Sequence, residues 1–210
     1  MTARILLPAD LFGRPFRISA GVSAGAGRSR LNGGDLARPL WGIRSGEPFG
    51  HTTAEFCRAL GPRLSPDSFF SHQTAAQLLG VPLPARHERA RPLHVSVAVP
   101  GRPMDARDVI GHLLSITADE IVLWRDLPIT GPARTWLDLA AVLNLADLVA
   151  AGDYLLYWRH PLTTIAALTD ALARYPSRRG LVMARRALPL LRDRAESRRE
   201  SKLRVFIVEA

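Results

Sequence analysis

The sequence predicts an α+β fold. Short β-branched runs in the middle of the chain predict a sheet, and apolar residues at helical spacing before and after them predict helices. The 210 residues are 47% hydrophobic and 22% charged, which is enough for one or two ordinary cores and argues against wholesale disorder. We therefore expect three sections, at residues 1–46, 47–175 and 176–210.

The first section, residues 1–46, is expected to be a small winged-helix-like DNA-binding unit. Ser19–Val22 predicts a short helix, Gly25–Gly27 a turn, Arg28–Leu31 a second short helix and Leu36–Ile43 an extended segment. This is the order of elements in a small winged helix-turn-helix. Glycines inside the second helix would weaken it by roughly 1 kcal/mol each, so their position decides whether this helix is competent to read DNA.

The middle section, residues 47–175, begins with two predicted helices. Thr52 or Thr53 caps the first one, which reaches Leu64, and the second runs from Ser71, its predicted N-cap, to Gly80. A small mixed or antiparallel sheet is expected next, because β-branched runs are divided there by Pro, Gly and Asp. Its predicted strands are Leu93–Val99, Val109–Leu114, Ile121–Trp124 and Leu127–Ile129.

From Thr130 onward the chain is expected to be helical. An early Pro132 suits the start of the first of these helices. The predicted helices are Thr130–Ala140, Asn144–Trp158, Thr163–Tyr175 and a basic one at Arg178–Leu191, interrupted near Pro189.

The charge of +9 is concentrated at the two ends of the chain. Residues 1–60 hold 8 basic and 4 acidic residues, residues 61–173 hold 9 and 11, and residues 174–210 hold 11 and 4. Two basic ends favour a polyanion-binding protein over a small-molecule enzyme. The single Lys202 among 28 basic residues points to a coding bias toward Arg, which changes the residue type without setting the net charge.

We expect DNA contacts from residues around the predicted winged helix. Arginines there are suited to phosphate binding, and residues at the start of the second helix would face base edges. The alternative is that these arginines are simply solvated. The candidates are Arg14, Arg17, Arg28, Ser29, Arg30, Arg38 and Arg44.

No catalytic site is expected in the middle section. Ser71 and His72 are adjacent, and adjacent helical residues point about 100° apart, so we expect a helix cap and a half-buried histidine instead of a nucleophile and its base. Asp138 shares a helix face with Thr135 and is expected to be partly buried, bonded to Arg134 or to a backbone N–H. A role of Asp138 in partner or nucleotide contact is the alternative.

The six histidines show no metal-binding spacing, and the lone Cys57 excludes a cysteine zinc cage and an internal disulfide. His94 and His112 lie on neighbouring predicted strands, where they could meet across the sheet. We nevertheless expect neither a metal nor a cofactor.

Two segments carry a resemblance to a known family. Phe70–Pro84, with Ser71 and His72, and Leu127–Ala141, with Arg134, Thr135 and Asp138, resemble signature segments of the abortive-infection antitoxin-like regulators of the AbiEi family. The resemblance spans most of residues 14–160. It implies a winged helix followed by an α/β regulatory domain, DNA as a partner, and a cognate toxin or another protein as a further partner.

The last segment, Ala195–Ala210, resembles the entry helix of very-short-patch-repair-like endonuclease domains. That resemblance implies a nuclease-like role for Glu200, which alone supports no hydrolysis because metal-dependent cleavage needs several converging carboxylates. We expect this basic segment to be partly detached, with Leu203, Phe206 and Ile207 exposed and the nuclease-like domain truncated. The alternatives are a targeting portion of an inactive nuclease and a pure interaction protein.

No apolar run approaches the roughly 18–20 residues that cross a bilayer, and the N-terminus is too weakly apolar for a signal peptide. We therefore expect a cytoplasmic protein without a membrane partner.

Overall fold

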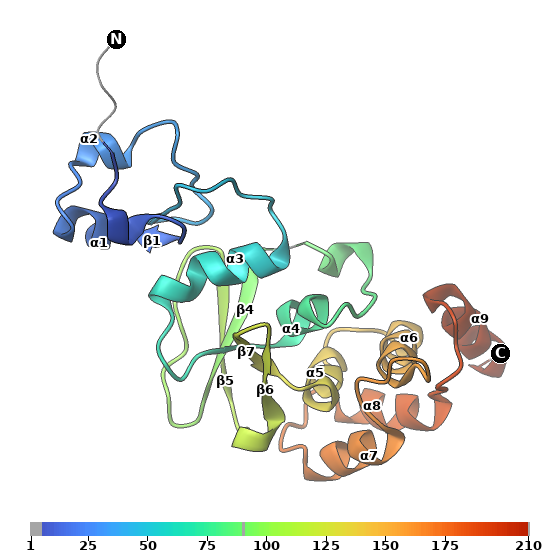
Figure 1. The fold of residues 1–210 in the computed structure, drawn as a ribbon. Helices are drawn as coiled ribbons and strands as arrows, with labels where there is room; N and C mark the ends of the chain where they lie inside the picture. Colours follow the sequence, from blue (N-terminus) through green and yellow to red (C-terminus); the bar gives the residue numbers. More distant parts are fainter. Residues whose placement is uncertain (1–5, 90, 210) are drawn as a thin grey trace.

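The computed structural model describes residues 6–89 and 91–209 and has a mixed α+β fold (Figure 1). It therefore confirms the predicted fold class. A small N-terminal unit precedes a five-stranded sheet with two helices, and the C-terminal part is a group of packed helices.

The N-terminal unit contains two short helices and a two-stranded antiparallel sheet. Its elements are the 3-10 turn Ala9–Leu11, β1 (Phe16–Arg17), α1 (Ile18–Ser23), α2 (Arg28–Leu31) and β2 (Ile43–Arg44). Gly25 has φ +87° and Gly27 is the N-cap of α2, so the glycines lie outside both helices. The two expected short helices and the turn between them are confirmed, whereas the expected extended segment Leu36–Ile43 is strand only at its last residue, and the unit has a small core of its own around Phe16 and Leu31.

The five-stranded sheet has the order β5-β4-β3-β7-β6 and is mixed, because β3 runs parallel to β7 and antiparallel to β4. The four predicted strands are present within a residue at their ends, and the central β3 was not predicted. The strands are β3 (Phe69–Phe70), β4 (Leu93–Ala98), β5 (Val109–Leu114), β6 (Ile121–Trp124) and β7 (Leu127–Thr130).

Two helices, α3 (Thr53–Leu60) and α4 (His72–Leu78), pack against one face of this sheet. Thr52 caps α3 through a reciprocal arrangement with Glu55, and a 3-10 turn, Gly61–Arg63, extends it. Leu93 and Val95 of β4 are buried in the core shared with these helices. Because side chains alternate along a strand, His94 and Ser96 lie on the opposite face of β4.

The C-terminal helices follow the predicted pattern, and residues between Trp136 and Val205 share one core. Asn144 and Thr164 supply capping side chains to the second and third of them. The elements are α5 (Pro132–Leu139), α6 (Leu145–Leu156), α7 (Ile165–Arg174), α8 (Leu181–Ala187), the 3-10 turn Leu188–Leu190 and α9 (Arg198–Glu209).

The expectation of a detached C-terminal segment is wrong. Helix α9 docks on α6 through Val205, which is buried, while Arg204 pairs with the buried Asp153. Arg198 and Lys202 both pair with Asp147 on α6. The prediction failed because it considered the apolar stripe of α9 and overlooked the polar face, whose cations match two carboxylates of α6.

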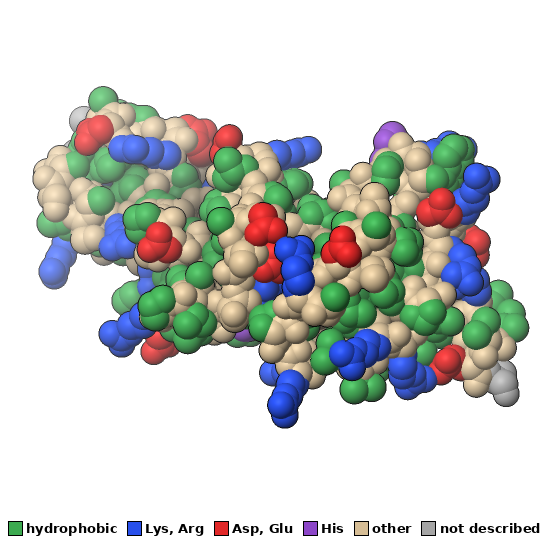
Figure 2. All heavy atoms as spheres, turned by 90° about the horizontal axis from the view of Figure 1, so that it is seen from below, with side chains coloured by type: hydrophobic (Ala, Val, Ile, Leu, Met, Phe, Trp, Pro, Cys, Tyr) green, Lys and Arg blue, Asp and Glu red, His purple; other side chains and the backbone are tan. Residues whose placement is uncertain are grey.

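The apolar stripe of α9 is exposed, as predicted. Leu203, Phe206 and Ile207 are 61%, 74% and 66% exposed. Figure 2 shows hydrophobic side chains at this end of the molecule, and Lys and Arg side chains spread along the same face.

Among the described residues, none of the helices has the length and apolar character needed to cross a membrane.

Candidate nucleic-acid interface and a three-histidine pocket

A large arginine-rich groove lies where the N-terminal unit meets the sheet. Its volume is about 1010 Å³, and one wall comes from Arg17 to Arg44 while the other comes from Arg63 and the segments that precede β4 and β5. Its lining holds one acidic side chain, Asp108, together with Arg17, Arg38, Arg44, Arg63, Arg91 and Arg107. A concave surface with this excess of guanidinium groups attracts polyanions and is suited to binding phosphates.

An exposed aromatic ring lies among these arginines. Trp41 is 66% exposed, and the Arg63 guanidinium carbon lies 6.0 Å from the centre of its ring. Arg63 also donates a hydrogen bond to the Trp41 carbonyl at 3.2 Å. An accessible indole beside cations provides a surface on which a base or sugar can stack.

The arginines that the sequence singled out fall into two groups. Arg17 and Arg38 are exposed and line the groove, and Arg38 also donates to the Asn32 carbonyl at 2.9 Å. Arg28 and Ser29 are exposed on α2, and Arg14 is exposed and donates to the Asp10 carbonyl.

The other two candidates, Arg30 and Arg44, hold the N-terminal unit together. Both terminal nitrogens of Arg30 bind the Asp35 carboxylate, at 2.8 and 3.0 Å. Arg44 is buried and donates to the carbonyl of Leu31, and burial followed by the neighbouring Arg38 lowers its pKa. These contacts engage both guanidinium groups within the unit, and the contact of Arg30 and Arg44 with DNA stays a prediction.

Sequence reasoning missed Trp41, Arg63, Arg91 and Arg107 as part of this surface. Segments distant in the sequence form the groove, so no local spacing of residues predicts it. The regional charge was the available signal, and it pointed to the basic N-terminal end without locating the opposite wall.

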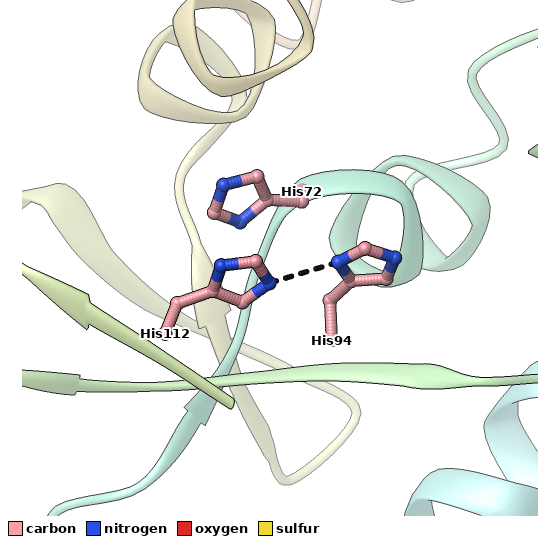
Figure 3. Close-up of side chains that lie close together, drawn as sticks. All are labelled: His72, His94 and His112. Carbon is pink, nitrogen blue, oxygen red and sulfur yellow. Dashed lines mark hydrogen bonds between the residues drawn. The ribbon is translucent and has the colours of Figure 1, made fainter. Parts of the chain in front are cut away.

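A second cavity, of about 490 Å³, contains three histidines (Figure 3). His72 begins α4, His94 lies on β4 and His112 lies on β5. His94 Nδ1 and His112 Nε2 are 2.9 Å apart, so the predicted meeting of these two residues across the sheet is confirmed. The His72 ring stacks on His112 with centroids 3.9 Å apart.

The expectation that Ser71 and His72 do not face each other is wrong. Ser71 Oγ lies 2.8 Å from His72 Nδ1, because His72 has φ +50° and Ser71 is extended, so the 100° helical offset does not apply between them. Ser71 occupies the N-cap position, but its side chain makes no capping hydrogen bond. It shares a 2.6 Å hydrogen bond with Ser96 instead and is fully buried, which leaves no room for a substrate to reach this hydroxyl.

Burial favours the neutral form of the three imidazoles. Burial, with smaller contributions from His112 and His94, lowers the pKa of His72 to about 2. Burial also lowers the pKa of His94 to about 4, and burial followed by Arg179 lowers that of His112. Neutral imidazole is the form that binds metal ions.

An ion-pair network forms another wall of the same pocket. The buried Arg134 donates to Asp138 Oδ1 at 3.0 Å, as the sequence predicted, and to Glu120 and the Ser115 carbonyl. Tyr175 also donates to Asp138 Oδ1, at 3.2 Å. Burial raises the pKa of Asp138 to about 6 against the opposing effect of Arg134, and its Oδ2 atom is buried without a hydrogen-bond partner among the described residues.

Thr135 and Glu200 have structural roles. Thr135 is buried and its hydroxyl donates to the Thr130 carbonyl at 2.9 Å, so it secures the start of α5 to the end of β7. Glu200 accepts from the backbone N–H of Glu196 at 2.9 Å, and its own N–H donates to the Ser197 hydroxyl at 3.2 Å, so both bonds secure the start of α9.

Comparisons with known proteins give one informative match. No family model matches the chain, and no match was found among curated proteins. The fold is similar to that of the solved Rv2827c protein from Mycobacterium tuberculosis, with a TM-score of 0.54 and 17% sequence identity over 92% of this chain and 76% of that one. At this identity the match is a likeness of fold.

Proposed function

We propose that this protein binds duplex DNA through the arginine groove and acts as a transcriptional regulator of the AbiEi antitoxin-like kind. The observation that carries the proposal is the lining of the groove, with five arginines besides the buried Arg44, one aspartate and an exposed tryptophan. The resemblance of the middle section to AbiEi-like regulators supports a role in transcriptional regulation. Because the proposed ligand is DNA, we propose that the protein acts in the cytoplasm.

The N-terminal unit supports this assignment in a modified form. Helix α2 is a single turn of four residues, so it presents few side chains to a major groove. Arg28 and Ser29 on α2 are exposed, and Arg17 and Arg38 extend the same unit into the arginine groove. We therefore propose that α2 makes a small contact with the DNA and that the arginine groove binds most of the phosphates.

Fluorescence anisotropy with labelled duplex DNA across a salt series tests this proposal. If about 4–6 phosphates are neutralised, log K falls with log salt with a slope near −4 to −5. Arg17→Ala and Arg107→Ala should each lower the slope by about 1 and weaken binding for all sequences. Arg159→Ala is the matched control, because Arg159 is exposed outside the groove and stacks on Trp158.

The outcomes separate the proposal from its alternatives. Binding that is lost equally in all three variants would indicate attraction by net charge alone and would overturn the assignment of the groove. Absence of binding at low salt would favour a second candidate, a protein partner held on the exposed Leu203, Phe206 and Ile207 of α9.

A further inference from the structure

Three histidine side chains from three different elements converge on one pocket. One nitrogen each of His72, His94 and His112 lies within 4.8 Å of the other two. The strand register explains the convergence: Ser96 on β4 pairs with His112 on β5, so His94 and His112 are diagonal neighbours on one face of the sheet. His72 reaches them because it lies two residues after the end of β3, which pairs with β4.

We propose that His72, His94 and His112 bind one divalent transition-metal ion of the zinc class, with an open coordination position facing the 490 Å³ pocket. Imidazole nitrogens suit Zn²⁺, and three histidines with a fourth position left open form a known kind of zinc coordination. The proposal does not depend on DNA binding.

The nitrogen spacing is close to that of zinc ligands, but the His72 ring, stacked on His112 at an interplanar angle of 16°, must turn for the three rings to share one ion. Tetrahedral zinc with bonds of about 2.0–2.1 Å separates its ligand nitrogens by about 3.3 Å. His94 Nδ1 and His112 Nε2 are 2.9 Å apart, so a metal that replaces the proton shared between them needs them to part by a few tenths of an ångström. Rotation about the broad terminal torsion of His72 can bring its ring nitrogen closer.

Two further features support a binding role over simple packing. His72 adopts φ +50°, which is uncommon for a residue other than glycine, and such conformations cluster at functional sites. Its Nδ1 contacts the buried Ser71 hydroxyl at 2.8 Å, which is the kind of second partner that orients a metal-bound histidine.

The pocket also carries groups that would interact with a ligand of the metal. Arg179 and Tyr175 line it, and the buried Asp138 contributes an oxygen that lacks a hydrogen-bond partner among the described residues. The positive charge of Arg134 is offset by Asp138 and Glu120, which reduces its repulsion of a cation. A water molecule or an anionic oxygen is the chemistry suited to the open position.

Calorimetric titration of the tag-free, chelator-treated full chain with Zn²⁺, together with the visible spectrum of the Co²⁺ form, tests the proposal. We expect one ion per chain and a Co²⁺ spectrum typical of four- or five-coordination. His94→Gln and His112→Gln should each weaken affinity by more than about 100-fold, and Ser71→Ala by about 10–100-fold. His160→Ala is the control, because His160 is exposed and lies outside the pocket.

Circular dichroism of each variant separates lost ligation from lost folding. If a glutamine variant fails to fold, the Co²⁺ spectrum of the wild-type chain still decides between histidine ligation and an octahedral, water-rich site. A stoichiometry well below one, affinity unchanged in both glutamine variants, or equal loss in His160→Ala would overturn the proposal.

Discussion

Replacing His72 by Asn should make the protein less sensitive to acid. The imidazole of His72 is held neutral in the folded chain, with its pKa lowered mainly by burial to about 2, whereas it titrates near 6.5 in the unfolded chain. The unfolded state therefore binds the additional proton, so the stability linked to this group is complete above pH 6.5 and is lost as the pH falls toward 2. Asparagine is a suitable replacement because it tolerates the left-handed backbone found at His72.

The magnitude follows from the pKa difference. At pH 5, which is 1.5 units below the unfolded pKa, the linked loss is about 2 kcal/mol at 1.36 kcal/mol per unit. Urea unfolding at pH 7.5 and pH 5 with a chelator present should therefore show a free energy of unfolding that falls by about 2 kcal/mol less in His72→Asn than in the wild type. Asp138, whose burial raises its pKa to about 6, titrates with the opposite sign but is common to both proteins.

His160→Asn provides the control and should keep the pH dependence of the wild type, because His160 is exposed. If His72→Asn and the wild type lose equal stability between these two pH values, the imidazole of His72 is protonated in the folded protein and the reasoning fails.

Two other predictions follow from the buried ion pairs. Deleting residues 195–210 removes the buried Val205 and the contacts of α9 with α6, which should cost roughly 2 kcal/mol of unfolding free energy. Thermal scanning should therefore show an unfolding midpoint about 4–8 °C lower. An unchanged midpoint would support the sequence-based expectation of a detached segment. Arg134→Ala leaves the buried Asp138 carboxylate without its cation and should cost about 3–5 kcal/mol at pH 8 in urea unfolding, with a smaller cost at pH 5 where Asp138 is protonated. A cost independent of pH would show that lost packing, not charge, dominates.

Secondary structure was predictable where periodicity and capping agreed. The strands β5 and β6 match their predicted ranges because β-branched runs are bounded there by Pro, Gly and Asp. Strand β3 was missed because Phe69–Phe70 is too short to show alternation, although it occupies the centre of the sheet. Its importance comes from the pairing with β4 and β7, which is a non-local property.

The sites were less predictable than the elements. Composition indicated a basic N-terminal end, but it could not distinguish the exposed Arg17 from Arg30, whose guanidinium is paired with Asp35 five residues later. The three-histidine pocket depended on the backbone of His72, and histidine tolerates a positive φ without requiring it, so the sequence does not predict this conformation. Long-range pairing and a strained dihedral angle are both set by tertiary context.

The groove and the three-histidine pocket are joined through the same two strands. Two residues of the groove lie shortly before the histidines: Arg91 is three residues before His94, and Asp108 is four residues before His112. Arg91 and Asp108 form an ion pair at 3.7 Å just before β4 and β5 begin. A smaller cavity of about 280 Å³ is lined by both Arg91 and His94 and therefore lies between the two sites. If the proposed ion shifted His94 or His112, it would act on strands that begin just after groove residues, and any effect of that ion on DNA affinity would be matched by an equal effect of DNA on ion affinity.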